Sequence, residues 1–467
     1  MKLINYIRSE VKHGNKRPNW DSFDFFKDDK YLKPVLEDDA ILYSLDDVTD
    51  IADDGKLSAE HESPRAEVEQ LREELSKLQN QFAAYREQMQ EALLNQVDGE
   101  NAGPGAALHE TSNAASPLDP KKEKANDLEA SYFSSYSYNA IHESMLKDTI
   151  RTDAYRDFIY DNKHLFAGKV VLDVGCGTGI LSMFCAKAGA KKVIAVDNSD
   201  IIDKARQNVF ENGFQDIITC VRGKVEEVTM PVAKVDVIVS EWMGYCLLYE
   251  SMLDSVIYAR DRYLAPDGLM VPSHAKLRIA PIADSELVTS HVDFWNDVYG
   301  FTMTGMLENV HDEALIRSVE PKDLAAESVA FLELDLHTAR TRDLTFCNRF
   351  EISWSKDGEE DLQGFVIWFD MFFGRSPVES VPGSMTIARA TEKGMVAFTT
   401  GPDATQTHWQ QGALLIKKPF ATFRKGDILA GYVGYQKMEK QERSLDIEVR
   451  WKAPSMLEER RQVWSLN

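Results

Sequence analysis

A glycine-rich turn between an apolar segment and a helical segment constrains the fold of this chain more than any other feature. Residues 170–174 form a continuous apolar run, residues 175–179 read Gly-Cys-Gly-Thr-Gly, and residues 180–188 carry a helical pattern. Two further apolar runs, 192–197 and 235–240, follow at the spacing expected of strands that alternate with helices. Continuous apolar strands are typical of parallel sheets that are covered on both faces. The order therefore predicts a doubly wound α/β domain.

The chain is too long for one hydrophobic core and divides by composition. Its 467 residues exceed the size at which single cores stop growing. Two segments before the first strand, 136–146 and 152–162, have the mixed three- and four-residue apolar spacing of helices. After Pro272 the pattern changes to short alternating segments such as 275–279 and 344–346, which predict an antiparallel β-rich domain. We expect five parts: an acidic N-terminal segment 1–63, a heptad helix 64–95, a flexible linker 96–127, the α/β domain 128–271, and the β-rich domain 272–467 with an aromatic insertion at about 288–312.

The N-terminal part has two features, each with two interpretations. Between Glu37 and Glu62 there are ten acidic residues and one basic residue, Lys56. Such a run is typical of a solvated, mobile segment, and a docking surface for basic proteins is the alternative. Apolar residues between 65 and 94 follow a heptad seam. Because three heptads are marginal for an autonomous coiled coil, self-association and a single amphipathic helix that folds back both remain open.

Charge and cysteine content exclude several classes of protein. The 53 Lys and Arg residues against 76 Asp and Glu residues give a net charge of −23, so we expect no direct nucleic-acid binding, which needs a basic surface. No apolar run approaches the roughly 18 residues of a membrane span. The N-terminus also lacks the apolar core of a secretory signal. The five cysteines are scattered without a Cys-x-x-Cys pair, which predicts no metal site and a reducing, cytoplasmic compartment.

The glycine-rich turn has the chemistry of a nucleoside-binding loop. Gly175 and Gly177 let the backbone approach a ligand that a Cβ would block. The spacing is G-x-G-x-G, whereas the dinucleotide fingerprint is G-x-G-x-x-G. Asp197 ends the second strand, where a carboxylate can bind ribose hydroxyls. These residues predict a nucleoside-bearing cofactor; a pyrophosphate-binding dehydrogenase and a purely structural turn are the alternatives.

Two glutamates, Glu241 and Glu250, flank a loop that directly follows the apolar run 235–240. Functional sites of open α/β sheets lie at the carboxyl ends of the strands. Two carboxylates held close together repel each other unless a cation lies between them, and a planar guanidinium suits this role because it forms bidentate bonds. The loop also contains Trp242 and Tyr245, whose rings are costly to expose. This argues against the alternative of two ordinary surface glutamates.

Four separated segments together resemble the type I protein arginine N-methyltransferases, over essentially all of residues 128–467. They are the family's N-terminal helical signature at 132–152, its cofactor loop at 173–179, its double-glutamate loop at 241–250 and its Thr-His-Trp loop at 407–409. The segment 31–37 and the aspartate at position 197 are most similar to the third, zinc-finger-bearing member of the family. The first 175 residues contain no cysteine, so this sequence cannot form a Cys₂His₂ finger. We expect either that upstream sequence is missing or that the finger has been lost.

The resemblance implies a fold, an activity and a set of site residues. The fold would be α/β: a Rossmann-like methyltransferase domain followed by an antiparallel β-barrel-like domain with a helical dimerisation arm. The activity would be methyl transfer from S-adenosylmethionine to arginine guanidino nitrogens. Glu241 and Glu250 would clamp the guanidinium, while His408 with Asp148 would stabilise the site and relay the released proton. The cofactor would meet Arg151 at its carboxylate, Gly175 and Gly177 at its methionine side, Asp197 and Ser199 at its ribose, Val225 and Glu226 at its adenine, and a lid formed by Tyr132, Tyr136, His142 and Met145.

The resemblance also implies a product and partners. Met145 and Met252 are similar to a pair that leaves room for two methyl groups on one nitrogen, which implies asymmetric dimethylarginine after monomethylarginine. The aromatic segment 290–309 resembles the family's arm and implies a head-to-tail homodimer. The acidic balance suits Arg-rich protein substrates, with ribosomal proteins suggested by the subgroup. A methyltransferase for another substrate, and a non-catalytic dimeric scaffold, are the alternatives.

Overall fold

The structure is a computed structural model that describes residues 129, 132–283, 285–417, 422–438, 441–454 and 456–466. The acidic segment 1–63, the heptad helix 64–95 and the linker 96–127 lie outside the described residues, so these interpretations stay predictions. Within the described residues, no helix combines the length and apolar composition that a membrane crossing requires.

A five-stranded, wholly parallel sheet forms the first domain. Its order is β3 (Ile218–Arg222), β2 (Lys192–Asp197), β1 (Val170–Val174), β4 (Val235–Val239) and β5 (Leu264–Val271). The central strands β1 and β4 are almost entirely buried, as their continuous apolar sequences require. The predicted doubly wound domain is confirmed.

Helices cover both faces of this sheet. α7 (Ile180–Lys187) joins β1 to β2, α8 (Ile201–Glu211) joins β2 to β3, and α9 (Met252–Tyr263), after the one-turn η5 (Tyr249–Ser251), joins β4 to β5. Because parallel crossovers are right-handed and the strand order reverses at β1, α7 and α8 lie on one face and α9 on the other. α5 (Asn139–Lys147), α6 (Thr149–Asp161) and η4 (Lys163–Leu165) precede the sheet.

The start of α5 differs from the sequence-based prediction. A helix was expected from residue 136, but the backbone of Tyr138 is extended, with φ −89° and ψ 138°, so α5 begins at Asn139. Residues 132–135 form a separate helical turn before it. This break lets the Tyr136 and His142 side chains approach the sheet from two different segments.

The second domain is built from antiparallel strands, as predicted. One sheet has the order β7 (Leu315–Arg317), β13 (Gln411–Leu415), β11 (Gly364–Phe373), β6 (His274–Ile282) and β8 (Val329–Asp335), with β12 (Val396–Thr399) beside β11. A second has the order β17 (Arg460–Leu466), β16 (Gln441–Lys452), β15 (Ile428–Met438) and β9 (Phe346–Ser353), and β10 (Glu359–Asp361) pairs with β14 (Thr422–Arg424). The short helices η8 (Pro321–Asp323), η9 (Thr341–Leu344) and α11 (Ile387–Glu392) connect strands. The strand predicted at 344–346 is wrong for its first two residues, because η9 ends at Leu344 and β9 begins at Phe346.

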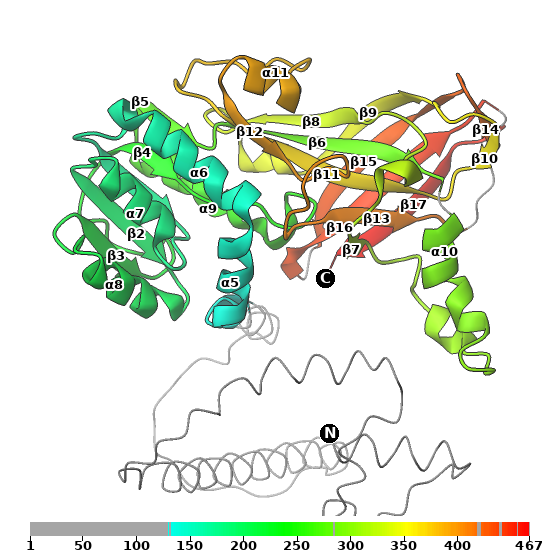
Figure 1. Cartoon of the computed structure of the whole chain (residues 1–467), viewed down its shortest axis with the longest axis horizontal. Helices are drawn as coiled ribbons and strands as arrows, with labels where there is room; N and C mark the ends of the chain where they lie inside the picture. Colours follow the sequence, from blue (N-terminus) through cyan, green and yellow to red (C-terminus); the bar gives the residue numbers. More distant parts are fainter. Residues whose placement is uncertain are drawn as a thin grey trace, which may run out of the picture. The chain divides into compact units, whose positions relative to one another are not determined.

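The segment between β6 and β7 extends away from the β-rich domain (Figure 1). It contains α10 (Ser285–His291), η6 (Asp293–Asn296) and η7 (Thr304–Leu307). Three of its aromatic side chains are exposed, with 49% of the surface of Phe294, 97% of Tyr299 and 72% of Phe301 accessible, and Trp295 is half-buried. The insertion predicted from its aromatic residues is therefore an exposed arm of the described chain.

One continuous hydrophobic core joins the two domains. The ring of Tyr155 on α6 packs edge-on against Phe373 on β11, with centroids 5.1 Å apart. The buried Arg260 of α9 donates hydrogen bonds to the carbonyls of Leu336 and Ala339 at 2.8 and 2.6 Å. The β-rich domain is thereby packed against α6 and α9, two helices of the α/β domain.

Candidate active site

The glycine-rich turn lies at the carboxyl end of β1 and has a backbone that only glycine adopts easily. Gly175, Gly177 and Gly179 have φ values of 71°, 52° and 83°. A Cβ placed on Gly175 would lie 2.2 Å from the terminal methyl of Met252, and one on Gly177 would lie 3.3 Å from the His142 ring. The turn is thus closely lined by side chains from α9 and α5.

Asp197 lies beside this turn because β1 and β2 pair in parallel and end together. One oxygen of its carboxylate accepts a 2.9 Å hydrogen bond from the Gly177 amide. The other oxygen accepts from the Ser199 amide at 2.8 Å and from the Ser199 hydroxyl at 2.6 Å. The structure therefore brings together three of the residues predicted to bind a nucleoside.

His142 covers the turn from α5. Its Nε2 lies 2.7 Å from the Tyr136 carbonyl, so this nitrogen carries the proton and donates. Burial lowers the pKa of His142, although the Tyr136 carbonyl opposes the effect. The ring is therefore neutral near pH 7, and it links Tyr136 to the cofactor loop.

Glu241 follows β4 and binds a cation that belongs to the chain itself. Arg151 on α6 approaches one oxygen of its carboxylate with Nε at 2.9 Å and a terminal nitrogen at 2.7 Å, and both side chains are only 8% exposed. The other terminal nitrogen of Arg151 reaches the Met145 carbonyl at 3.2 Å and the Thr152 hydroxyl at 3.3 Å. The guanidinium of Arg151 is thus held by an ion pair to Glu241 and by hydrogen bonds from Nε and from one terminal nitrogen.

Glu250 ends the same loop with a different partner. The Tyr136 hydroxyl donates a 2.6 Å hydrogen bond to its carboxylate. Burial raises the pKa of Glu250; the Tyr136 hydrogen bond and the positive charge of Arg443 oppose that rise, and the negative charge of Glu241 adds to it. The backbone of Glu250 has φ 70° and ψ −9°, a left-handed conformation that is costly for a residue with a Cβ.

Asp148 and His408 meet across 260 residues of sequence. One oxygen of Asp148 accepts from the His408 amide at 2.9 Å and from His408 Nδ1 at 2.7 Å, and the other accepts from the Arg151 amide at 3.1 Å. Burial alone would raise the pKa of Asp148, but the hydrogen bonds from His408 and Arg151 outweigh burial and lower it. Because Nδ1 donates to a carboxylate, Nε2 of a neutral His408 is the nitrogen that can accept a proton.

Trp409 fixes the Thr-His-Trp loop to the double-glutamate loop. Its indole N–H donates a 2.8 Å hydrogen bond to the Met243 carbonyl. Its ring stacks on Phe398 of β12, with an interplanar angle of 11°. The orientation of the loop between the two glutamates therefore depends on the β-rich domain.

The remaining predicted residues have fewer side-chain contacts with the rest of the site. Val225, which is buried, and Glu226, which is exposed, follow β3 at the carboxyl edge of the sheet. Met252 touches the position of Gly175, whereas Met145 is connected to the site through its carbonyl, which accepts from Arg151 and Thr152. The cofactor and catalytic roles of these residues stay predictions.

Asp173, at the penultimate position of β1, is a fully buried acidic residue directly before the glycine-rich turn, and the sequence predicted no role for it. Burial raises its pKa to about 7, against a 2.6 Å hydrogen bond donated by the Ser182 hydroxyl. In the described part of the chain its second oxygen has no hydrogen-bond partner. An acidic residue inside a continuous apolar strand, immediately before a glycine-rich turn, is the sequence signal that could have identified it.

These residues fit a nucleoside-bearing cofactor. The left-handed glycines keep the backbone bare at the end of β1, and Asp197 ends β2 beside them. Across the residues that the structure describes, no three His, Cys, Asp or Glu side chains are grouped as metal ligands.

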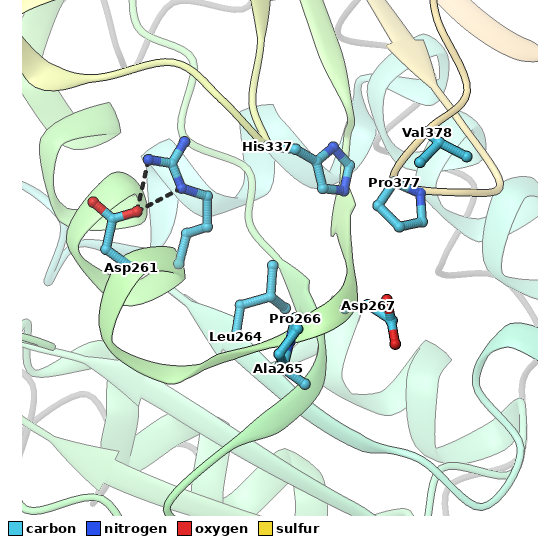
Figure 2. Close-up of a pocket in the computed structure, with 10 residues that line it drawn as sticks. Asp261, Leu264, Ala265, Pro266, Asp267, His337, Pro377 and Val378 are labelled. Atoms are coloured by element: carbon cyan, nitrogen blue, oxygen red, sulfur yellow. Dashed lines mark hydrogen bonds and ion pairs between the residues drawn. The ribbon is translucent and has the colours of Figure 1, made fainter.

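A surface hollow lies at the opposite edge of the parallel sheet. Figure 2 shows its lining, which includes Leu264, Asp267, His337 and Pro377. Leu264 pairs with Val235, the first residue of β4, so the hollow lies at the amino ends of the strands. It is separate from the glycine-rich turn and from the two glutamates.

Comparisons with known proteins identify the family. Residues 171–268 match the family described as a methyltransferase domain, and residues 273–456 match the arginine methyltransferase oligomerization subdomain. The ribosomal protein arginine N-methyltransferase rmt3 of Schizosaccharomyces pombe is 44% identical over 97% of this chain and 79% of its own length. Protein arginine N-methyltransferase 1 of the same yeast is 45% identical over 71% of this chain and 93% of its own length.

Solved structures of arginine methyltransferases are also similar to this chain. The Trypanosoma brucei PRMT1 enzyme–prozyme heterotetrameric complex with AdoHcy has a TM-score of 0.64 at 36% identity and covers 72% of this chain and all of that chain. An Arabidopsis thaliana protein arginine methyltransferase 10 structure has a TM-score of 0.62 at 31% identity, with 72% and 100% coverage. This chain belongs to the protein arginine N-methyltransferase family, whose methyl donor is S-adenosylmethionine.

Proposed function

We propose that this chain is a type I enzyme that forms monomethylarginine and then asymmetric dimethylarginine on Arg-rich proteins, ribosomal proteins among them. The geometry at the two glutamates carries this proposal. Glu241 holds a guanidinium of the chain itself at 2.7 and 2.9 Å, and Glu250, nine residues later, presents a buried carboxylate. The name of the yeast relative, a ribosomal protein arginine N-methyltransferase, supports the substrate class.

The chemical difficulty of the reaction lies with the substrate. S-adenosylmethionine supplies an electrophilic methyl group on a sulfonium. A guanidinium is delocalised and cationic, with a pKa of about 12.5 or more, and is a poor nucleophile. Glu241 and Glu250 fix its plane and draw the positive charge away from the attacking nitrogen. Fixing the orientation of the reacting groups can supply roughly 7–11 kcal/mol.

The chain's other polar groups hold the site in order. Arg151 forms an ion pair with Glu241 and, by the resemblance, also meets the cofactor's carboxylate. Asp197 and Ser199 present oxygens suited to ribose hydroxyls. His408 is oriented by Asp148 through Nδ1, so its Nε2 can take up the proton that the methylated nitrogen releases.

The product type depends on the space beside the methyl acceptor. Met252 lies against Gly175 of the cofactor turn, and Met145 is on α5, which also carries His142. By the resemblance, these two unbranched side chains leave room for a second methyl group on the same nitrogen. The proposal is therefore asymmetric, not symmetric, dimethylation.

One assay tests the activity and the clamp together. The full chain is incubated with methyl-labelled S-adenosylmethionine and a glycine-arginine peptide, with a glycine-lysine peptide as control, and the hydrolysed product is analysed for each methylarginine. We expect monomethyl- and asymmetric dimethylarginine from the arginine peptide alone. Glu250→Gln should abolish turnover while S-adenosylhomocysteine still binds in calorimetry. Equal labelling of the lysine peptide, or full activity in Glu250→Gln, contradicts the proposal.

The exposed arm supports the proposal of a homodimer. Its aromatic residues Tyr299 and Phe301 are 97% and 72% accessible, and exposed aromatic groups of this kind mark interaction surfaces. The match to an oligomerization subdomain covers this segment. Sedimentation velocity of Phe301→Ser should show loss of the dimer, and an unchanged sedimentation coefficient contradicts the assignment. The five free cysteines support a reducing location, and we propose the cytosol.

A further inference from the structure

Arg443, on β16 of the β-rich domain, contacts the active site although it belongs to none of the motifs described above. Its guanidinium carbon lies 3.6 Å from the centroid of the Tyr132 ring and 5.2 Å from that of Phe133. One terminal nitrogen donates a 2.7 Å hydrogen bond to the carbonyl of Glu250. The other lies 3.6 Å from the carboxylate of Glu129. One cation thus binds two aromatic faces, a backbone carbonyl and a carboxylate.

These contacts join three parts of the protein. Tyr132 and Phe133 lie in the helical turn before α5, Glu250 ends the double-glutamate loop, and Arg443 comes from β16. Glu129 also forms a 2.7 Å ion pair with Lys224, after β3. Glu129 and residues 132–136 are therefore held between the methyltransferase domain and the β-rich domain.

The contacts converge on the geometry of Glu250. The left-handed backbone of this residue is costly, and the hydrogen bond from Arg443 fixes its carbonyl. The Tyr132 ring under Arg443 packs edge-on against Tyr136, with centroids 5.1 Å apart, and the Tyr136 hydroxyl holds the Glu250 carboxylate. Arg443 therefore supports Glu250 twice, once through its main chain and once through its side-chain partner.

We propose that Arg443 is a positioning residue for methyl transfer: it latches the segment 132–136 and the backbone of Glu250 to β16, so that the Glu250 carboxylate and the Tyr136 hydroxyl keep one arrangement. This inference rests on the proposed role of Glu250. A planar guanidinium suits the latch because it stacks on the Tyr132 ring while its edge donates hydrogen bonds.

Arg443 also affects the pKa of Glu250. The groups that face this carboxylate are Tyr132 and Tyr136 from the segment before α5, Glu241 from the loop after β4 and Arg443 from β16, with Tyr245 and Tyr249 on its own loop. Arg443 is the group among these that brings a positive charge. Its removal therefore raises the pKa of Glu250 further and moves the acidic limb of the pH–rate profile upward.

The test compares Arg443→Met, which keeps an apolar stem without the charge, with Arg443→Lys, which keeps the charge without the plane. Arg450→Met is the matched control, because Arg450 lies on the same strand and is exposed beside Glu448. We expect Arg443→Met to lower kcat by about 10- to 100-fold, with a smaller change in KM, because small misplacements of reacting groups have effects of this size. Its acidic limb should move to higher pH than in wild type. Arg443→Lys should keep the wild-type limb with an intermediate kcat, and Arg450→Met should match wild type.

Hydrogen exchange supplies a readout that does not need activity. In Arg443→Met the amides of residues 132–146 should exchange faster while β1, β2 and β4 keep their protection. A kcat within twofold of wild type with an unmoved acidic limb overturns the proposal, as does an equal loss of protection over the whole domain, which indicates a folding defect. If wild type itself does not methylate arginine, the proposed function fails, and the exchange experiment still decides whether Arg443 holds the segment.

Discussion

Replacement of Asp148 by Asn tests how strongly the Asp148–His408 pair holds the two domains together. Asp148 is the N-cap of α6, and three N–H groups donate to its two oxygens: the amide and Nδ1 of His408, and the amide of Arg151. Asn has the same shape but only one acceptor oxygen. In either orientation its NH₂ group therefore faces an N–H donor.

The size of the effect follows from these bonds. If the amide oxygen stays on His408, the N-cap hydrogen bond to α6 is lost, at about 1 kcal/mol. The two bonds from His408 also change from charge-assisted to neutral, which roughly halves each contribution of about 1.5–3 kcal/mol. We expect Asp148→Asn to lower the free energy of unfolding by about 2–4 kcal/mol at pH 7.

The contribution of Asp148 to the free energy of unfolding depends on pH with a definite sign. The folded-state pKa of Asp148 is lowered, so its contribution is present above the unfolded pKa of about 3.9 and is lost as the pH falls through the lower, folded pKa. The difference between wild type and Asp148→Asn should therefore shrink below about pH 4. Urea unfolding at pH 7 and below pH 4 measures the difference in stability between the two proteins.

Asp153→Asn is the control, because Asp153 lies on the same helix in an exposed pair with Arg156 and should change stability by no more than about 0.5 kcal/mol. A difference at pH 7 no larger than that of the control, or one that is the same at both pH values, refutes the reasoning.

Three further substitutions probe the cofactor turn and the product. Asp197→Ala should weaken S-adenosylhomocysteine binding by about 1–3 kcal/mol in calorimetry, because the acceptor at the end of β2 is lost; unchanged affinity would reassign the ribose site. Gly175→Ala should destabilise the fold and reduce cofactor binding, because its Cβ would lie 2.2 Å from the Met252 methyl at a φ of 71°; wild-type thermal stability and affinity would show that the turn adapts. Met145→Phe should shift the product toward monomethylarginine in mass spectrometry, and continued asymmetric dimethylation would remove the steric account.

The sequence predicted three of the five strands of the parallel sheet, with β4 ending one residue earlier than expected, and it did not predict β3 and β5. β1 and β2 begin and end at the residues predicted, because each run is closed by a glycine turn or an acidic residue. The predicted start of α5 was wrong because the apolar spacing continues through Tyr138, whereas the backbone of Tyr138 is extended and interrupts the helix. Periodicity reports which face of a segment is buried, and it carries less information about where a backbone turns.

The motifs located the site, but its contacts could not be predicted from them. Arg151 and Glu241 are 90 residues apart, Tyr136 and Glu250 are 114 apart, and Arg443 is 193 residues from Glu250. The local pattern around Arg443, on an alternating β-strand, is that of an ordinary exposed position. The first two pairings form within the α/β domain, and the third forms only when the β-rich domain packs against it.

In the proposed guanidinium clamp, the buried carboxylate of Glu250 links substrate binding to proton release. Burial raises its pKa despite the Tyr136 hydrogen bond and the Arg443 charge, so in the absence of substrate the ionised form is disfavoured and the folded state loses stability as the pH rises through that pKa. A guanidinium in contact with the carboxylate favours the ionised form and lowers the same pKa. Binding of the arginine side chain and loss of a proton from Glu250 are therefore coupled, and the affinity for substrate increases as the pH rises through the pKa of the free enzyme. The buried carboxylate destabilises the folded protein when no cation is bound. The same property makes the site prefer a cationic substrate.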